Sequence, residues 1–465
     1  MEAILKYLKT QGAVLDRAYY ERIARWTEWY RGHVESFHKY RVFTGVKRIE
    51  RTRYQLGMCK KAAEEWANLL LNERVLLTTE NKKFQVQLAD TLNANKFYSR
   101  GNQLIEKAFA LGTGAFVEWL DADGAVVIDY VQADMIFPLT VENGEITECA
   151  FASERKGGYY IQVHRKGLVQ NKMIDDKGKE IALPYGVAPE VKSPAKLFQI
   201  VKPNIVNNID LRQPLGISVF ANALDQAKGA DIAFDGLVND MLLGRTRAYI
   251  PMKYATVQQV ADGSRKPVFD PNDALFYVFE GQADENKDNK IQVTQPLIRA
   301  TEHITALEDC LSRFSDKCGL GADRFKYAQG TIQTATQVIS EKSALYQNVQ
   351  KHNLGLRDAL ADMVAAIAAL LKVKAPGDIS VTMDDSIIED KAKRKADFIM
   401  EINAGIRQAW EYRVEFLGET ENDARAATGE IAEDASAEDD AAGTGGNGDM
   451  KPGAGKKPGA GNSKA

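Results

Sequence analysis

One stretch, residues 331–373, constrains the fold of this chain most strongly, because it reads as a single helix of unusual length. Apolar side chains recur through it at steps of three, four and seven residues, and charged side chains fill the positions between them. This spacing places a wide apolar stripe along one side of a helix. His352–Gly355 is a weak point, since a glycine inside a helix costs about 1 kcal/mol relative to alanine, and we expect a bend there. A helix of roughly forty residues is longer than most globular helices, so we expect it to span more than one part of the protein.

The composition limits the classes of protein to which the chain can belong. Of its 465 residues, 45% are hydrophobic and 27% are charged, which is ordinary for a soluble globular protein. A net charge of −4 argues against a wholly basic nucleic-acid binder, so any contact with DNA has to be local or weak. The four cysteines form no CxxC pair and are too sparse for a disulfide framework. The longest apolar run is too short to span a membrane. We expect no cofactor, no metal ion and no membrane contact.

The order of periodicities along the chain predicts an α+β fold that is mainly helical. Residues 1–110 have helical spacing, with Gly32 placed to end one helix. From residue 112 the period changes to the alternation of strands, separated by turns rich in Gly, Asn and Asp. We expect one antiparallel meander here. Its strands are Gly112–Leu120, Val126–Val131, Ile136–Val141, Ile146–Glu154, Tyr159–His164, Leu168–Asp175 and Glu180–Leu183.

A helix, a small β-rich module and a second helix follow, and together they form an excursion from the main body. The first helix is expected from Ile217 to Leu243, and the second from Leu297 to Lys317. In the first, Asp231 and Asp235 lie one turn apart and predict a like-charged face. The second leads into a glycine-bounded loop, residues 318–330. The loop's centre alternates cations and aromatic rings: Arg324, Phe325, Lys326 and Tyr327.

The C-terminal part is predicted to be helical from Ile387 to Leu417 and to end in a low-complexity tail rich first in Asp, Glu and Ala, then in Gly, Lys and Pro. No zinc-protease motif, nucleophile elbow or metal-spaced Cys/His set occurs along the chain. The five histidines are scattered. We therefore expect a protein that is not an enzyme and has no catalytic residues.

The order of these parts resembles the portal protein, or head-to-tail connector, of tailed bacteriophages, in the type found in long-tailed phages of Gram-positive hosts. The resemblance covers nearly the whole chain, up to about Glu430. The segments that carry it are Trp26-x-x-Trp29-Tyr30-x-Gly32, Lys61–Glu73, Ala110–Ala115, Ile217–Arg245, and Gly330–Thr336 followed by Ser340–Ser343.

The resemblance implies a portal-type subunit built around a long bent helix. Its regions would be a wing at 1–216 (helices, then antiparallel strands), a first stem helix at 217–247, a clip at 248–296, a second stem helix at 297–317, a channel loop at 318–330, a long helix of wing and crown at 331–376, a crown at 377–432 and a disordered tail at 433–465.

The resemblance also implies a function and partners. Such proteins form a homo-oligomeric ring, typically of twelve subunits, at one capsid vertex of the virion after assembly in the host cytoplasm. Double-stranded DNA passes through the ring, independently of sequence, during packaging and ejection. Further partners would be the large subunit of the packaging ATPase (terminase), head–tail adaptor proteins, and the major capsid and scaffolding proteins.

Two sets of residues are candidates for contact with DNA. Arg324 and Lys326, with Phe325 and Tyr327, would touch the DNA backbone through charge contacts. Asp231 and Asp235, if they line the channel, would repel phosphates and prevent tight binding. A simpler interpretation remains open for both sets: the acids are solvated helix residues, and Phe325 and Tyr327 pack the loop against its neighbour.

Two other hypotheses compete with a DNA conduit. A capsid-associated scaffold or assembly protein would form no closed ring and have no DNA channel. An enzyme acting on nucleic acid would need clustered carboxylates or a metal site, and the sequence presents neither. The helix–module–helix excursion followed directly by the cation–aromatic loop favours the conduit.

Overall fold

The computed structural model describes residues 2–13, 16–43, 47–121, 123–184, 187–251, 257–259, 265–267, 276–279, 292–325, 335–383, 391–417 and 421–428. The chain divides into two compact units, Met1–Ile388 and Glu389–Ala465. Helices and strands alternate in irregular order, and the predicted α+β, mainly helical class is confirmed. No helix among the described residues is long and apolar enough to cross a membrane.

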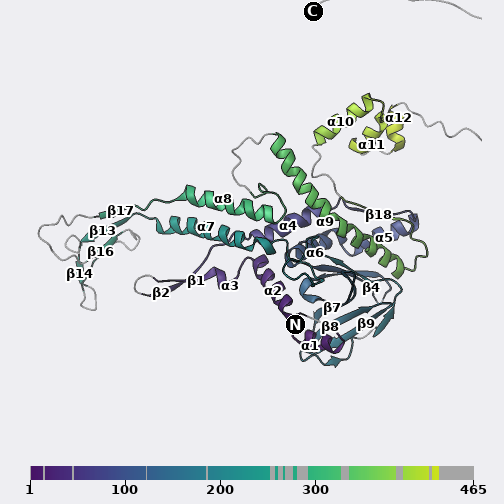
Figure 1. The fold of residues 1–465 in the computed structure, drawn as a ribbon, viewed down its shortest axis with the longest axis horizontal. Helices are drawn as coiled ribbons and strands as arrows, with labels where there is room; N and C mark the ends of the chain where they lie inside the picture. The colour runs from purple at the N-terminus through teal and green to yellow at the C-terminus, as the bar shows by residue number, and fades with distance from the viewer. Residues whose placement is uncertain are drawn as a thin grey trace, which may run out of the picture. The chain divides into compact units, whose positions relative to one another are not determined.

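Among the first 111 residues, those that the structure describes form six helices and three short strands (Figure 1). The second helix begins where Asp16 accepts a hydrogen bond from the Ala18 N–H, and it ends at Gly32, whose φ of 82° suits only glycine without strain. The helices are α1 (Glu2–Thr10), α2 (Arg17–Arg31), α3 (Glu35–His38), α4 (Met58–Leu70), α5 (Lys82–Ala94) and α6 (Phe97–Leu111).

The prediction that residues 1–110 are entirely helical was wrong at three places. Strands β1 (Lys39–Phe43) and β2 (Arg48–Thr52) form an antiparallel hairpin, and β3 (Leu76–Thr79) pairs with a strand from far along the chain. In β1 and β2 exposed and half-buried residues alternate, which is the strand period of two. The alternation is short and rich in Arg and Lys, so it carries little apolar signal.

The strands predicted between residues 112 and 183 are present, but they form two sheets and not one meander. A three-stranded sheet has the order β12–β4–β5, and a six-stranded sheet has the order β10–β9–β8–β7–β6, with β11 also paired to β9. A short 3₁₀ turn, η1 (Ala133–Met135), separates the sheets between β5 and β6. The strands are β4 (Gly114–Leu120), β5 (Val126–Gln132), β6 (Ile136–Glu142), β7 (Glu145–Arg155), β8 (Gly158–Arg165), β9 (Leu168–Ile174), β10 (Glu180–Ile181), β11 (Glu190–Lys192) and β12 (Phe198–Val201).

The predicted excursion is formed by α7 (Leu224–Leu243) and α8 (Ala300–Lys317), which pack along each other (Figure 1). The first helix begins seven residues later than predicted. The preceding segment is held against the end of α6, where the Val219 N–H donates to the Phe109 carbonyl at 2.9 Å. A side chain at Gly112 would collide with the Gly216 carbonyl. A short 3₁₀ turn, η2 (Ala221–Ala223), then leads into α7.

Between α7 and α8 lies a small β-module. Its central strand, β13, pairs in parallel with β16 and antiparallel with β17. The described strands are β13 (Arg247–Pro251), β14 (Val257–Gln259), β15 (Arg265–Pro267), β16 (Phe276–Phe279) and β17 (Gln292–Thr294).

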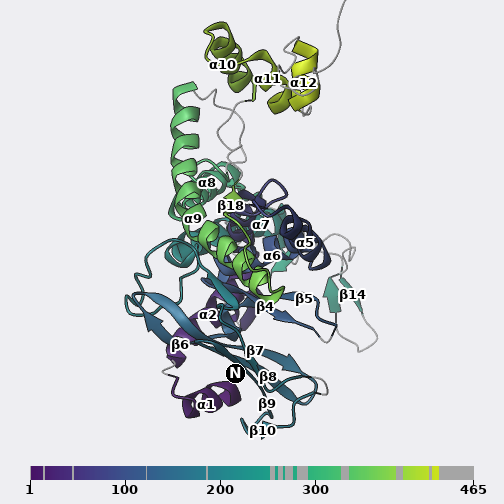
Figure 2. The ribbon, with the colours of Figure 1, turned by 90° about the vertical axis from the view of Figure 1, so that its right-hand side faces the viewer.

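The long helix is α9, Ala335–Leu370, and it stays helical through His352–Gly355. Figure 2 shows it changing direction along its length, in agreement with the expected bend. Residues 331–334 lie outside the described residues. The second half of α9 packs on β4, β12 and β18, and its buried side chains Leu360, Met363, Val364 and Ile367 belong to the main hydrophobic core.

Strand β18 (Ile379–Thr382) pairs antiparallel with β3, from Ile379↔Thr79 to Thr382↔Leu76. Through this pairing, β18 belongs to the first unit. From the sequence, these residues were placed in the crown, which was predicted to begin at Gly377. The second unit begins at Glu389, and it contains α10 (Lys391–Asn403), α11 (Ala409–Leu417) and α12 (Glu421–Thr428). Residues 429–465, which include the predicted tail, lie outside the described residues.

Candidate functional site

The start of the cation–aromatic loop is anchored to the main body directly after α8. The indole Nε1 of Trp66 donates to the Cys318 carbonyl at 2.9 Å, and the Asn348 side-chain amide donates to the Gly319 carbonyl at 2.9 Å. Gly319 has a φ of 79°, which lets the chain turn away from the helix axis. These contacts bring α4, α8 and α9 to one point.

An aromatic cluster lies beneath this anchor. The ring of Trp66 packs against His352 at 4.5 Å between centroids, and both contact Phe109. Burial lowers the pKa of His352 to about 3, so the imidazole is neutral at physiological pH. Its Nδ1 accepts a hydrogen bond from the Asn204 N–H at 2.9 Å. Within the predicted weak point, His352 and Asn353 are thus buried, whereas Leu354 and Gly355 are exposed.

Arg324 emerges from the anchored start of the loop, and its guanidinium is paired with Glu65 on α4. Glu65 also binds Lys61 at 3.0 Å. Burial tends to raise the pKa of Glu65, but the bonds from Arg324 and Lys61 outweigh it and hold the pKa below its usual range. The Arg324 side chain remains 41% exposed, so a solvent-borne anion can still reach it.

The remaining residues predicted to contact DNA from this loop are Phe325, Lys326 and Tyr327. Phe325 is buried, and its ring lies 6.2 Å from that of Phe314 on α8. This position favours the simpler interpretation, in which Phe325 packs the loop. Lys326 and Tyr327 lie outside the described residues.

Asp231 and Asp235 do not form a solvent-facing acidic surface, and the structure corrects that expectation. Their exposed fractions are 6% and 7%. Asp231 accepts a hydrogen bond from the Leu56 N–H at 2.8 Å, and Asp235 accepts one from the Tyr54 N–H at 3.0 Å. Both carboxylates therefore bind the segment that follows the β1–β2 hairpin. Burial raises the pKa of Asp231, although the bonds from the Leu56 N–H and His38 oppose that rise. Within the subunit, both carboxyl groups serve as acceptors that fix the chain after β2.

Helices α7 and α8 meet through small residues on α7. A side chain at Gly229 would collide with the sulfur of Cys310, and one at Gly236 would collide with the ring of His303. The two glycines are seven residues apart, as are their two partners, which defines an antiparallel register of close approach. At the far end, the His303 imidazole lies 2.9 Å from Asp240, which is also paired with Arg299.

The outer surface of the α7–α8 pair is unusually apolar. Most of its exposed large apolar side chains lie near the end of α7 and the start of α8, and Leu297 there is 90% exposed. Large apolar side chains exposed together on a folded chain indicate a contact with another molecule. The exposed side chains are Ile232, Met241, Leu242, Leu243, Leu297, Ile298 and Ile304.

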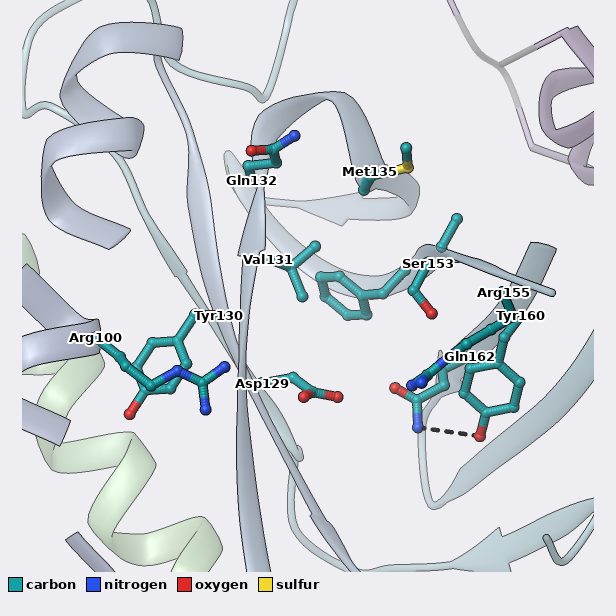
Figure 3. A pocket seen from close by; sticks show the side chains of 12 residues that line it. Arg100, Asp129, Tyr130, Val131, Gln132, Met135, Ser153, Arg155, Tyr160 and Gln162 are labelled. Carbon is teal, nitrogen blue, oxygen red and sulfur yellow. Dashed lines mark hydrogen bonds between the residues drawn. The ribbon is translucent and has the colours of Figure 1, made fainter. Parts of the chain in front are cut away.

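A separate cavity of about 270 Å³ lies between β5 and strands β7 and β8 (Figure 3). Several of its polar side chains have partners within the subunit. Asp129 accepts a hydrogen bond from the Trp119 indole at 2.9 Å, Arg100 stacks on Tyr130, and Tyr160 donates to Asn171. None of these contacts pairs a nucleophile with a base. The cavity is lined by Arg100, Asp129, Tyr130, Val131, Gln132, Met135, Phe151, Ala152, Ser153, Arg155, Tyr160 and Gln162.

The remaining chemically reactive groups of the described residues are dispersed or buried. No three metal-ligating side chains come together in the described part of the chain. All four cysteines are free thiols, and burial raises the pKa of Cys59, Cys149 and Cys318. The fold therefore presents an anchored loop and a long apolar helical hairpin as its distinctive features.

Exposed apolar side chains indicate a protein that contacts other molecules, and sequence comparison specifies the family. The sequence model of the family described as "Phage portal protein, SPP1 Gp6-like" matches residues 16–440. Because this match spans most of the chain, the protein belongs to that family of phage portal proteins. No curated protein sequence matches the chain.

Several solved structures are similar to the chain at low identity. A virion of a native gene transfer agent (GTA) particle has 14% identity and a TM-score of 0.43, over 78% of this chain and 88% of the other. The neck of a native GTA particle, computed with C12 symmetry, has 13% identity and a TM-score of 0.40, over 77% and 87%. The neck of an empty GTA particle, computed with C6 symmetry, has 13% identity and a TM-score of 0.37, over 78% and 88%.

Proposed function

We propose that about a dozen copies of this chain form a ring at one capsid vertex and that double-stranded DNA enters and leaves the capsid through its centre. Membership of the portal protein family supports this function. The observation on the subunit that carries the proposal is the apolar outer surface of the α7–α8 hairpin. Such a surface costs free energy in water, and neighbouring copies would cover it in a ring.

We assign the regions of the subunit accordingly. The wing comprises residues 1–216 together with α9 and β18. The α7–α8 hairpin is the stem, and residues 248–296 form the clip, which meets the terminase during packaging and adaptor proteins afterwards. The crown begins at Glu389, where the second unit starts. The virion is the site of action, and the major capsid and scaffolding proteins surround the wing.

Contact with DNA is proposed at the loop that begins at Cys318. Arg324 is held by Glu65 at its base and is partly exposed, so a phosphate would compete with a carboxylate for the same guanidinium. That competition gives weak contact independent of sequence, which suits passage better than tight binding. Asp231 and Asp235 have no part in this proposal, because they are buried within the subunit.

The first test is the mass of the purified full-length chain, measured by analytical ultracentrifugation across a range of concentrations, together with negative-stain images. A closed particle of about a dozen subunits with a central hole is expected. A compact dimer or tetramer without a hole would contradict the conduit and would favour a scaffold or assembly protein without a DNA channel.

A further inference from the structure

The β1–β2 hairpin is a two-stranded ribbon with two different faces. Its pairing runs from Lys39↔Thr52 to Phe43↔Arg48, and side chains alternate between the faces. The inner face consists of the half-buried Tyr40, Val42, Ile49 and Arg51, and the outer face is exposed. A two-stranded hairpin is at best marginally stable alone in water, so its contacts with other elements determine where it lies.

Helix α7 holds the inner face. The Tyr40 hydroxyl donates to Asp235 at 3.2 Å, and the chain after β2 is fixed by the backbone bonds to Asp231 and Asp235. His38, at the start of the hairpin, lies 3.4 Å from Asp231. The outer face consequently points away from α7, and Figure 1 shows the hairpin on the other side of α7 from α8.

The outer face is cationic and carries one exposed ring. Lys39, Arg41 and Arg48 outnumber Glu50 on it, and residues 39–53 as a whole have a net charge of +5. Phe43 is 65% exposed beside Arg48. A ribbon with exposed cations around an aromatic side chain has the composition of a protein-contact surface, in which aromatic residues and Arg are enriched.

Helix α8 offers a complementary row. Glu302, Asp309 and Asp316 are exposed and succeed one another at intervals of seven residues, which keeps them on one side of the helix, about 10.5 Å apart. They do not lie on the side that packs on α7, where His303, Leu307, Cys310 and Phe314 are less exposed. Asp309 is also paired with Arg313 on the surface.

We infer that the outer face of the β1–β2 hairpin of one copy docks on the Glu302–Asp309–Asp316 row of the next copy. This inference rests on the proposed ring and names one of its contacts. The two surfaces have opposite charge and lie on different sides of α7, so each copy uses one of them toward each neighbour. Such a head-to-tail contact is the type that generates closed rings. Phe43 favours a protein partner, because contact with DNA phosphates needs the cations alone.

The test uses two variants of the full-length chain with reversed charge. Lys39→Glu with Arg48→Glu changes the net charge of the hairpin's outer face from +2 to −2, and Glu302→Lys with Asp316→Lys changes that of the Glu302–Asp309–Asp316 row from −3 to +1. The contact occurs once for every subunit of the ring, so each variant alone should lose ring formation by about tenfold or more, as like charges face each other at every contact. Mixing the two variants in equal amounts should restore rings, because every contact in an alternating ring is again between opposite charges. Lys177→Glu, in the exposed turn after β9, is the matched control and should assemble normally.

The possible results distinguish an error in the assigned contact from an error in the proposed ring. If the wild-type chain forms rings and either variant alone forms them equally well, the assignment of the contact is wrong while the proposed function stands. If the ring of the Lys39→Glu, Arg48→Glu variant is intact but retains less double-stranded DNA than the wild-type ring, the hairpin faces DNA and the inference is overturned. A wild-type chain that never forms rings would contradict the proposed function as well.

Discussion

The proposed wing and the α7–α8 hairpin differ in how far their large apolar side chains are buried. In the wing, Trp66, Phe116, Phe137 and Phe198 are fully buried within one chain. In the outer part of the α7–α8 hairpin, several large apolar side chains, among them Met241, Leu242 and Leu243, remain exposed. The proposed wing thus buries its large apolar side chains within one chain, whereas neighbouring copies would cover those of the α7–α8 hairpin in the proposed ring.

The largest expected effect is on the wing. Trp66→Ala removes a fully buried ring and its bond to Cys318, so the free energy of unfolding should fall by about 3–5 kcal/mol. Urea denaturation of the unassembled chain measures it. Trp66→Phe is the control, because it keeps most of the ring's volume and loses the hydrogen bond, at about 0.5–1.5 kcal/mol. Equal losses for the two variants would show that packing around Trp66 is not what stabilises the wing.

A second prediction concerns the pH dependence of wing stability. Burial raises the pKa of Glu118 on β4 from 4.5 to about 8, and Gln199, with its amide nitrogen facing the carboxylate, donates to it at 2.5 and 3.0 Å. Between these two pKa values the folded chain holds a proton that the unfolded chain has lost. Stability should therefore fall as pH rises, by about 2–4 kcal/mol between pH 5 and pH 8, and level off above the folded pKa.

Glu118→Gln should remove that slope, as measured by urea denaturation at a series of pH values. In the α7–α8 hairpin, the pH dependence of stability should have the opposite sign. The bond to His303, with the charge of Arg299, holds the pKa of Asp240 below its usual 3.8. The stability that ionised Asp240 contributes is present above its pKa in the unfolded chain, and it is lost as pH falls through its pKa in the folded chain. A Glu118→Gln chain with an unchanged slope would contradict the burial of a neutral carboxyl in the wing.

The stability of the α7–α8 hairpin should depend on small residues at the positions of α7 that face α8. Gly236→Val places a branched side chain against His303, so we expect a loss of about 1–3 kcal/mol from overpacking and a larger loss of ring formation. Gly355→Ala is the matched control, because nothing lies within 4 Å of a Cβ there. It should stabilise α9 by about 0.5–1 kcal/mol. Thermal melting and sedimentation measure the two effects, and normal assembly of Gly236→Val would refute the close-packed register.

The smallest effect on stability is expected at the loop. Arg324→Ala removes an exposed ion pair with Glu65 and should cost no more than about 1 kcal/mol. Binding of double-stranded DNA to the assembled ring should weaken, with a smaller dependence on salt. Glu65→Gln should have the opposite effect, because it releases the guanidinium. Fluorescence anisotropy over a salt series distinguishes these results, and DNA binding unchanged in both variants would remove Arg324 from the proposed contact.

The long periodic elements could be predicted from the sequence, because their burial follows local spacing. Helices α8 and α9 and strands β4 to β9 lie close to their predicted bounds. The β1–β2 hairpin could not be predicted as readily, since its alternation consists of Arg and Lys around few apolar residues. The alternation from Lys39 to Phe43, with Gly45 in the turn region, was the available signal.

The candidate site was less predictable because its partners are far apart in the chain. A spacing of four residues predicted that Asp231 and Asp235 share a face, but it could not reveal the backbone N–H groups of Tyr54 and Leu56 that bury them. Similarly, the pairing of Arg324 with Glu65 spans 259 residues. Helical periodicity determines which side chains lie on the same face of a helix. It does not determine which residues from other parts of the chain contact that face.

The most direct measurement is hydrogen–deuterium exchange of the full-length chain below and above its assembly concentration. If neighbouring copies cover the hairpin, amides in the outer parts of α7 and α8 should gain strong protection on assembly, while those of β4, β7 and β8 in the wing should be protected in both states. Equal protection of the hairpin before and after rings form would contradict the central claim, because its apolar surface would then not be buried between subunits.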